Sequence, residues 1–410
     1  MVPNGWSLIK LKDIGKCING LTYSPKNVVD NGLLVLRSSN VQGAKLAFND
    51  NVYVNVDISS NSKTKVGDIL LCVRNGSRNL IGKSAFIDES AEGLAHGAFM
   101  SLFRSNNTPN YTFQLFQSSR FFQQVNQNLG ATINSINSGN LNQFKFPYPP
   151  LAERKKIAQI LSTWDRGIAT TEKLIDASKQ QKKALMQQLL TGKKRLGHDE
   201  GTYTFKQTRY GAIPTDWAYL AIKDIAVQKS EKNSKGLNLP VLSCSKYDGF
   251  VDSLKYFKKK VYSDDTSGYR IISKGCFGFP ANHIEEGSIG LQNLYDKGIV
   301  SPIYVVFQAN ANLVENRFLY AILKTDHYRQ IFSAATNASV DRRGSLRWKE
   351  FSAIHVSLPS LEEQKAIADV LELANKEIKL LQAKLAHFKQ EKKALMQQLL
   401  TGKRRVSLSS

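Results

Sequence analysis

The chain has 410 residues, of which 42% are hydrophobic. This is enough for about two to four folded domains and too apolar for a disordered protein. Lys and Arg number 56 against 34 Asp and Glu, which gives a net charge of +22. Such a surplus of positive charge favours a polyanionic partner, most often a nucleic acid, although a merely basic surface would give the same count.

Cysteine and histidine spacing argues against a metal centre or a disulfide framework. The four cysteines form no CxxC pair, and the six histidines never fall at metal-ligand spacing. We therefore expect buried thiols in a reducing compartment and no bound metal. The N-terminal stretch has no apolar core of signal-peptide length, and no apolar run approaches the roughly 18 residues that span a bilayer. We expect a cytoplasmic protein.

Residues 1–150 alternate short apolar runs with Gly, Asn and Ser clusters, which is typical of strands joined by loops. Aromatic residues on one side of Tyr111–Gln127 predict a helix. Pro149 and Pro150 then mark the start of a second helical pattern. The runs that predict strands are Gly32–Arg37, Val52–Val56, Ile69–Val73, Ser101–Arg104 and Phe144–Phe146.

Residues 208–360 repeat this plan. Pro214 and Trp217 match Pro3 and Trp6, and a helix is predicted over Asn316–Ala335 in place of the earlier aromatic helix. The interiors of the two copies differ almost everywhere else. This is expected of one scaffold that reads two different targets, whereas simple drift after duplication would not leave the helical segments alike.

Each copy is followed by a long helical pattern that ends in the same twelve residues, KKALMQQLLTGK, at Lys182–Lys193 and Lys392–Lys403. Apolar residues recur at 4-3-4-3 spacing along both patterns, as in helices packed as a coiled coil. Each seam holds one lysine, which we expect to set the register, and Gly192 and Gly402 are expected to end the helices. The seam residues are Ile157, Leu161, Trp164, Ile168, Ile175, Lys182, Leu185 and Leu189 in the first pattern, and Ile367, Leu371, Ile378, Leu381, Leu385, Phe388, Lys392, Leu395 and Leu399 in the second.

These patterns predict an α+β chain with a pseudo-twofold internal repeat. Two mixed α/β domains, at 1–150 and 208–360, would be separated by two long, antiparallel coiled-coil helices at 151–195 and 361–405, with a linker at 196–207. Pairing of the helices explains a seam that runs unbroken along both. The alternative is that each helix seals only its own domain, which would need a shorter apolar stripe.

No motif for catalysis stands out. Gly76–Ser84 (GSRNLIGKS) resembles a phosphate-binding P-loop, but five residues separate its glycines where the motif has four. The carboxylate pairs Asp264–Asp265 and Glu285–Glu286 each occur in one copy only. We therefore predict no catalytic residues in this chain.

The remaining candidates are polar and basic residues in the loops that differ between the copies. Arginine reads guanine, asparagine reads adenine, and serine or threonine can bond to either base, whereas lysine more often holds a phosphate. Any single residue could instead be an ordinary solvated loop side chain. The candidate DNA contacts are Arg37, Ser38, Asn40, Arg74, Asn75, Ser77, Arg78, Lys83, Thr132, Asn134 and Ser135 in the first copy, and Ser243, Lys246, Tyr247, Asn282, His283, Ser339, Arg342 and Arg343 in the second.

The helix entries and ends carry a family resemblance. LPSLEEQKAIADVL at Leu358–Leu371, its variant YPPLAERKKIAQIL at Tyr148–Leu161 and the two KKALMQQLLTGK segments resemble the specificity (S) subunit of type I restriction–modification systems. The likeness covers essentially the whole chain. One departure is Arg154, where the family usually has glutamine, as at Gln364.

The resemblance implies that each globular copy is a target recognition domain that reads one half of a bipartite sequence in double-stranded DNA. The helices would set the half-site spacing and dock two methyltransferase (modification) subunits, while restriction (endonuclease and translocase) subunits join the full complex. The chain itself would bind no cofactor, since S-adenosylmethionine, ATP and Mg would belong to the partner subunits. The alternatives are a self-sufficient DNA-modifying enzyme with an unrecognised site and a coiled-coil adapter whose basic charge is incidental.

Overall fold

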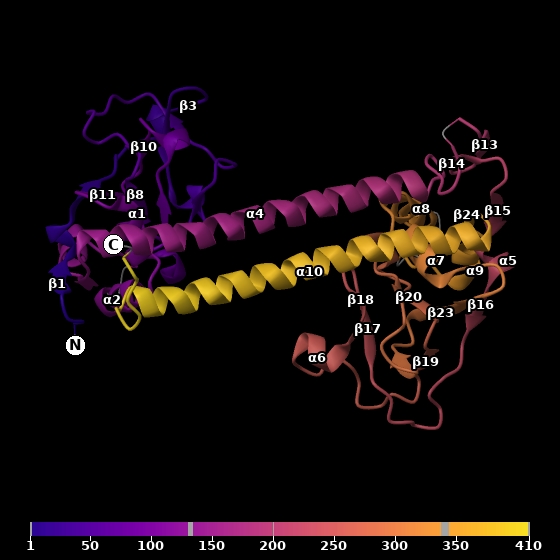
Figure 1. Ribbon diagram of the computed structural model, residues 1–410. Coiled ribbons are helices and arrows are strands. Elements are labelled where there is room, and N and C mark those ends of the chain that lie inside the picture. The colour runs from indigo at the N-terminus through magenta and orange to yellow at the C-terminus, as the bar shows by residue number, and fades with distance from the viewer. Residues whose placement is uncertain (1, 130–133, 200, 338–343, 409–410) are drawn as a thin grey trace. The chain divides into compact units, whose positions relative to one another are not determined.

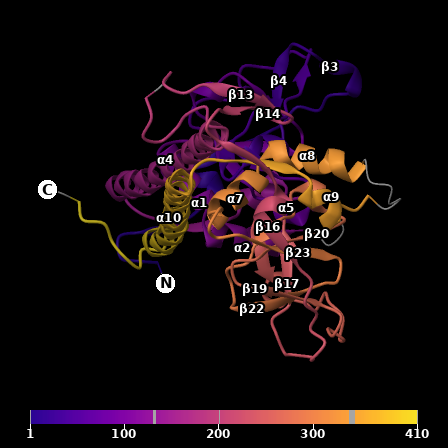
Figure 2. The same cartoon turned by 90° about the vertical axis from the view of Figure 1, so that its right-hand side faces the viewer.

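A computed structural model describes residues 2–129, 134–199, 201–337 and 344–408. It divides into a first unit, Met1–Lys173 with Gln382–Ser410, and a second unit, Leu174–Leu381. Two long helices, α4 (Leu151–Leu189) and α10 (Leu361–Leu399), each contribute to both units. They lie side by side in Figure 1 and in Figure 2. Within the described residues, no helix combines the length and the apolar character that a membrane crossing requires.

The first unit is built mainly from short antiparallel strands. Its strands are β1 (Ser7–Lys10), β2 (Gly15–Asn19), β3 (Val28–Val29), β4 (Leu33–Leu36), β5 (Val41–Gln42), β6 (Lys45–Leu46), β7 (Tyr53–Val54), β8 (Ile69–Cys72), β9 (Ser84–Phe86), β10 (Ala95–His96), β11 (Met100–Ser105) and β12 (Lys145–Tyr148). Its shorter helices are α1 (Pro109–Phe116), α2 (Ser119–Asn128) and α3 (Ser138–Asn142). One sheet has the order β2-β11-β8-β9, and β1 pairs with β12 directly before α4 begins. All five predicted strands are confirmed, with small shifts of their ends.

The second unit repeats this framework. Its strands are β13 (Phe205–Thr208), β14 (Gly211–Pro214), β15 (Ala218–Ala221), β16 (Ala226–Lys229), β17 (Leu242–Ser245), β18 (Gly249–Asp252), β19 (Arg270–Ser273), β20 (Phe277–Pro280), β21 (Gly290–Leu291), β22 (Lys297–Val300), β23 (Tyr304–Ala309) and β24 (His355–Leu358). Its helices are α5 (Ile222–Ile225), α6 (Ser253–Phe257), α7 (Asn316–Leu323), α8 (Asp326–Asn337) and α9 (Trp348–Ser352). The sheet β16-β23-β20-β21 corresponds to β2-β11-β8-β9, and the pair β15–β24 corresponds to β1–β12. The predicted internal repeat is confirmed.

Both helices predicted inside the globular copies are broken, so their prediction as single helices was wrong. In the first unit α1 ends at Phe116, and the Ser118 hydroxyl caps α2 by accepting a hydrogen bond from the Phe121 backbone N–H. In the second unit the Thr325 hydroxyl accepts one from the Tyr328 N–H at the start of α8. Serine and threonine at such positions favour a new helix start, a signal that aromatic periodicity alone does not contain.

The paired helices are confirmed, and they run antiparallel. In the first unit, Asp165 and Glu172 on α4 form ion pairs with Lys392 and Lys389 on α10, so residue numbers rise along one helix as they fall along the other. The rings of Trp164 and Phe388 meet edge to face, 5.7 Å apart. Every predicted seam residue is buried or half-buried.

The ends of the seam also belong to the domain cores. Ile157 and Leu161 from the start of α4 join Leu399 from the end of α10 in the core of the first unit. Leu189, Ile367 and Leu371 play the corresponding part in the second. Each core is thus sealed by the start of one helix and the end of the other. Helix pairing and domain sealing, posed as alternatives from the sequence, both occur.

An ion pair closes each unit at the point where a long helix begins, and the pair of the second unit is buried. Glu363, near the start of α10, accepts two hydrogen bonds from Arg195, at 3.0 and 2.6 Å. Both side chains are at least nine-tenths buried. Glu153, near the start of α4, likewise accepts two hydrogen bonds from Arg405. Arg405 Nε lies 2.9 Å from Glu153 Oε2. The Glu363 pair leaves little charge unsatisfied, as a buried ion pair must.

The predicted helix-ending glycines are confirmed, and packing explains why they are glycines. Gly192 and Gly402 have φ of +69° and +71°, a conformation that glycine adopts without strain. A Cβ on Gly192 would lie 2.3 Å from the ring of Pro214, and one on Gly402 would lie 2.4 Å from that of Pro3. The tail after each long helix therefore lies against the proline that opens a globular domain.

The two seam lysines have different surroundings. Lys392 Nζ lies 2.6 Å from Asp165 Oδ1, with the lysine side chain largely buried. Lys182 is half-buried, and no described acidic residue pairs with it. Burial accordingly lowers its pKa. The corresponding position to Asp165 on α10 is Asn375, which cannot supply the missing charge. That these lysines set the helix register stays a prediction.

This difference predicts opposite effects of one substitution. Lys182→Met removes an unpaired, partly desolvated charge and keeps an apolar side chain of similar length, so the free energy of unfolding should rise by up to about 1 kcal/mol. Lys392→Met leaves Asp165 without its ion partner and should lower that free energy by a similar amount. Urea unfolding of the two purified variants measures both, and shifts of the same sign would contradict the assignment.

The cysteines make a second prediction about stability and reactivity. All four are free; Cys72 and Cys276 are buried, and Cys17 and Cys244 half-buried. Burial raises the pKa of Cys17 and Cys72 to about 11 and that of Cys244 to about 12. These thiols should stay protonated at pH 8 and react with iodoacetamide far more slowly than in the urea-unfolded chain. Equal alkylation rates in the folded and unfolded chain would refute this prediction.

The same raised pKa values predict a pH dependence of stability. Because the thiol pKa is higher in the folded chain than in the unfolded one, the free energy of unfolding should fall as the pH rises from about 9 towards 11.

Candidate nucleic-acid interface

Three loops of the first unit that carry predicted DNA contacts meet at one place. The Asn75 amide donates a hydrogen bond to Ser38 Oγ at 3.1 Å, which joins the loop after β8 to the loop after β4. The Asn75 backbone N–H donates to the Asn134 carbonyl, and the Asn134 amide donates to the Gly76 carbonyl at 3.0 Å. Half-buried Ser135 forms a backbone bridge with Arg74. Asn75 and Asn134 therefore position the loops.

Four predicted side chains on this surface are exposed: Arg74, Ser77, Arg78 and Lys83. They are free to meet a polyanion. The Arg74 guanidinium lies 5.7 Å from the ring centroid of Phe99, which is 56% exposed. An exposed aromatic ring beside an arginine suits contact with bases or sugars. Sequence reasoning missed Phe99, whose neighbours gave no periodic or charge signal.

Two other candidates have internal partners. Asn40 is fully buried. Its amide donates to the Ala47 carbonyl at 2.8 Å and its Oδ1 accepts from the Arg37 backbone N–H at 2.9 Å. Half-buried Arg37 forms an ion pair with Asp50 at 3.0 Å. The Asn40 amide is not available to a base, so it shapes the turn that carries Ser38.

In the second unit one lysine joins two loops that carry predicted DNA contacts. Lys324, at the end of α7, donates hydrogen bonds to the carbonyls of Lys246 at 2.6 Å and Gly287 at 2.8 Å. This brings the β17–β18 turn, with exposed Lys246 and Tyr247, next to the turn that contains exposed His283. Lys324 was missed because a lysine at a helix end looks like an ordinary partner of the helix dipole.

The other second-unit candidates are less accessible or lie outside the described residues. Ser243 and Asn282 are half-buried, and Ser243 Oγ lies 2.7 Å from Ser253 Oγ. Of the remaining predicted contacts, Thr132 in the first unit and Ser339, Arg342 and Arg343 in the second lie outside the residues that the structure describes.

One group of side chains has the spacing of a cation site. Ligand atoms of His283, Glu285 and Glu286 all lie within 4.8 Å of one another. His283 Nδ1 lies 3.1 Å from Glu286 Oε1, and both of these side chains are exposed. A hydrogen bond within one short turn accounts for this closeness without a metal ion.

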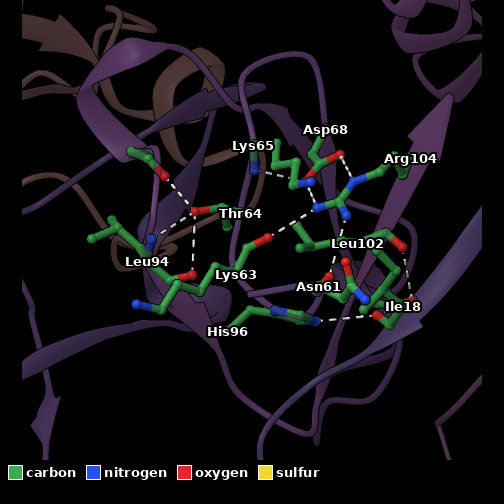
Figure 3. A network of polar contacts seen from close by, with 12 residues as sticks. Ile18, Asn61, Lys63, Thr64, Lys65, Asp68, Leu94, His96, Leu102 and Arg104 are labelled. Carbon is green, nitrogen blue, oxygen red and sulfur yellow. Dashed lines mark hydrogen bonds and ion pairs between the residues drawn. The ribbon is translucent and has the colours of Figure 1, made fainter. Parts of the chain in front are cut away.

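A polar network in the first unit braces the fold (Figure 3). The Arg104 guanidinium donates two hydrogen bonds to the buried carboxylate of Asp68, at 2.8 and 2.7 Å. It also donates to the carbonyls of Asn61 and Lys63. His96 Nε2 lies 3.1 Å from the Ile18 carbonyl oxygen. Burial lowers the pKa of the His96 imidazole. The Arg104–Asp68 pair satisfies both charges inside the fold, so this network serves the structure of the unit. The P-loop-like segment is likewise followed by strand β9, not by the helix that a P-loop needs.

Comparison with known proteins gives a consistent result over nearly the whole chain. A family model described as the type I restriction modification DNA specificity domain matches residues 3–179 and 214–390. The chain is 29% identical to the MjaX specificity subunit of Methanocaldococcus jannaschii, with 99% of this chain and 95% of the relative covered. It is 26% identical to the type I restriction enzyme MjaVIII specificity subunit of the same organism, with coverage of 99% and 94%.

A solved structure shares the fold. The type I restriction–modification system S subunit from M. genitalium superposes with a TM-score of 0.57 at 12% identity, with 100% of this chain and 99% of that one covered. The two stretches matched by the family model fall on the two repeats seen in the structure.

Substitutions of Arg78 and of Asn40 should affect different properties, DNA binding for Arg78 and stability for Asn40. Arg78→Ala should leave the free energy of unfolding unchanged and weaken DNA binding by about 1–3 kcal/mol, the range for an arginine that reads a base. Asn40→Ala should lower the free energy of unfolding by about 1–3 kcal/mol, because it leaves buried backbone groups unpaired. Thermal unfolding and DNA titration of both variants separate the two roles. A stable Asn40→Ala chain with impaired binding would reverse our assignment.

Proposed function

Because the chain belongs to the type I restriction–modification DNA specificity domain family, we propose that it is the DNA-recognition subunit of such a system and reads a target in two halves. The first recognition domain, residues 1–150, would read one half-site, and the second, residues 208–360, the other. The lengths of α4 and α10 would set the spacing between them.

The observation that carries this proposal is one framework built twice with different loops. The sheets β2-β11-β8-β9 and β16-β23-β20-β21 share their strand order, so the backbone that holds the loops is the same in both domains. The loop after β8 carries Arg74 and Arg78 in the first domain, whereas the loop after the corresponding strand β20 carries Asn282 and His283 in the second. Different base-reading side chains on one scaffold suit an asymmetric target.

We further propose that the repeated helix ends dock two modification subunits. The twelve-residue repeat exposes the same side chains in both copies: Lys183, Ala184, Gln187 and Gln188 on α4, and Lys393, Ala394, Gln397 and Gln398 on α10. Identical surfaces on one chain suit two copies of one partner. Restriction subunits would then join the complex.

We propose that the chain positions DNA and carries out no chemistry itself. Its side chains would hold phosphates and read base edges, and its buried acids would serve the fold, as Asp68 and Glu363 do. S-adenosylmethionine would be bound by the modification subunits, and ATP and Mg by the restriction subunits.

A domain exchange tests the proposal. Replacing residues 1–150 with the corresponding domain of another specificity subunit, in complex with the modification subunits, should change one half of the methylated sequence and leave the other half intact. Methylation mapping of genomic DNA measures this directly. A swap that changes both halves or neither would contradict it, and methylation by the purified chain alone would favour a self-sufficient enzyme.

A further inference from the structure

An unusually exposed segment follows β18 in the second unit. It comprises α6 and the next four residues, Ser253–Val261, here called the spur (Figure 1). Every residue from Leu254 to Val261 is exposed, and four of them are large and apolar: Leu254, Tyr256, Phe257 and Val261, at 43–52% exposure. Such a concentration of exposed apolar side chains marks an interaction surface.

Of the four lysines in the spur, two have partners among the described residues and two have none there. Lys255 donates a hydrogen bond to the Tyr295 hydroxyl at 2.9 Å, and Lys260 forms an ion pair with Asp264. Lys258 and Lys259 are exposed, and neither pairs with an acid in the part of the chain that the structure describes. Asp248, in the adjoining turn, already accepts hydrogen bonds from Tyr256 and Ser245.

The backbone at Lys258 is strained for a lysine. Its φ and ψ are 54° and 17°, in the left-handed region, where its N–H caps α6 by donating to the Leu254 carbonyl. At the corresponding ends of α4 and α10 the chain uses glycine, at Gly192 and Gly402. The turn therefore presents the Lys258 side chain at some cost in backbone strain, which a glycine there would relieve.

The spur is continuous with the predicted DNA contacts of the second unit. The Tyr256 hydroxyl donates to Asp248 Oδ2 at 3.1 Å, which holds the spur against the turn that contains Lys246 and Tyr247. Lys324 ties that same turn to Gly287, beside His283. The exposed rings and the free lysines therefore extend a surface that sequence reasoning had identified only in part.

We propose that the spur is a DNA-backbone contact of the second recognition domain. Lys258 and Lys259 bind phosphates, and the exposed rings of Tyr256 and Phe257 pack against the adjoining sugars. Because lysine acts on phosphates as a point charge, the spur adds affinity without adding sequence preference. This inference rests on the proposed function.

The test uses the full-length chain in complex with its modification subunits. Binding to a duplex with the mapped target and to an unrelated duplex is titrated over a range of salt concentrations. For Lys258→Gly with Lys259→Gln, the slope of log affinity against log salt should become shallower by about 2, since each lost phosphate contact contributes about 0.9. Affinity for both duplexes should fall by the same factor, and the Tm should not fall, because glycine relieves the strain.

Two further variants control the result. Lys259→Gln alone leaves the strained backbone untouched and should reduce the slope by about 1. Lys223→Gln, which removes an exposed lysine on α5, should leave it unchanged. An unchanged slope in the double variant, loss of binding to the target duplex alone or a lowered Tm would each overturn the inference. A wild-type complex without salt-dependent DNA binding would instead refute the proposed function.

Discussion

The structure depends on a carboxylate near the start of each long helix and on the arginine that follows the end of the other helix. Glu363 with Arg195, and Glu153 with Arg405, bring together residues that are far apart in the sequence. The Glu363–Arg195 pair is largely shielded from water, where an unpaired charge would cost several kcal/mol. Once these contacts form, the helix ends lie against the globular cores, and the apolar seam between α4 and α10 follows from their antiparallel course.

The same closure occurs in two different chain contexts. In the second unit, Gly192 and Pro214 are joined by a short stretch of chain, whereas in the first unit Gly402 and Pro3 are distant in sequence. The contacts are nevertheless alike: each glycine lies where a Cβ would meet the proline ring. Side-chain complementarity, and not the covalent connection, therefore decides how the tail of a long helix meets a globular domain.

The sequence predicted those features of the fold that depend on local periodicity and on repeated motifs. The long helices, their pairing, their glycine ends and the doubled framework followed from heptad spacing and from matched motifs, whereas the antiparallel direction was an expectation about packing. The helix breaks at Ser118 and Thr325 were missed because aromatic residues are buried on both sides of each break. Asn40 looked like a base-reading residue because its burial depends on carbonyls that lie later in the chain. Lys324 and the spur were missed since their importance comes from contacts between distant turns.

The division of the cores has a consequence for synthesis on the ribosome. The second unit is one continuous segment, Leu174–Leu381, so its parts leave the ribosome together. The first unit begins at the N-terminus, yet its core includes Met396, Leu399 and Leu400. Until those residues emerge, the domain that is made first exposes the apolar surface they will cover. The order of completion is thus the reverse of the order of translation, and the last turns of α10 are the final piece of the first domain.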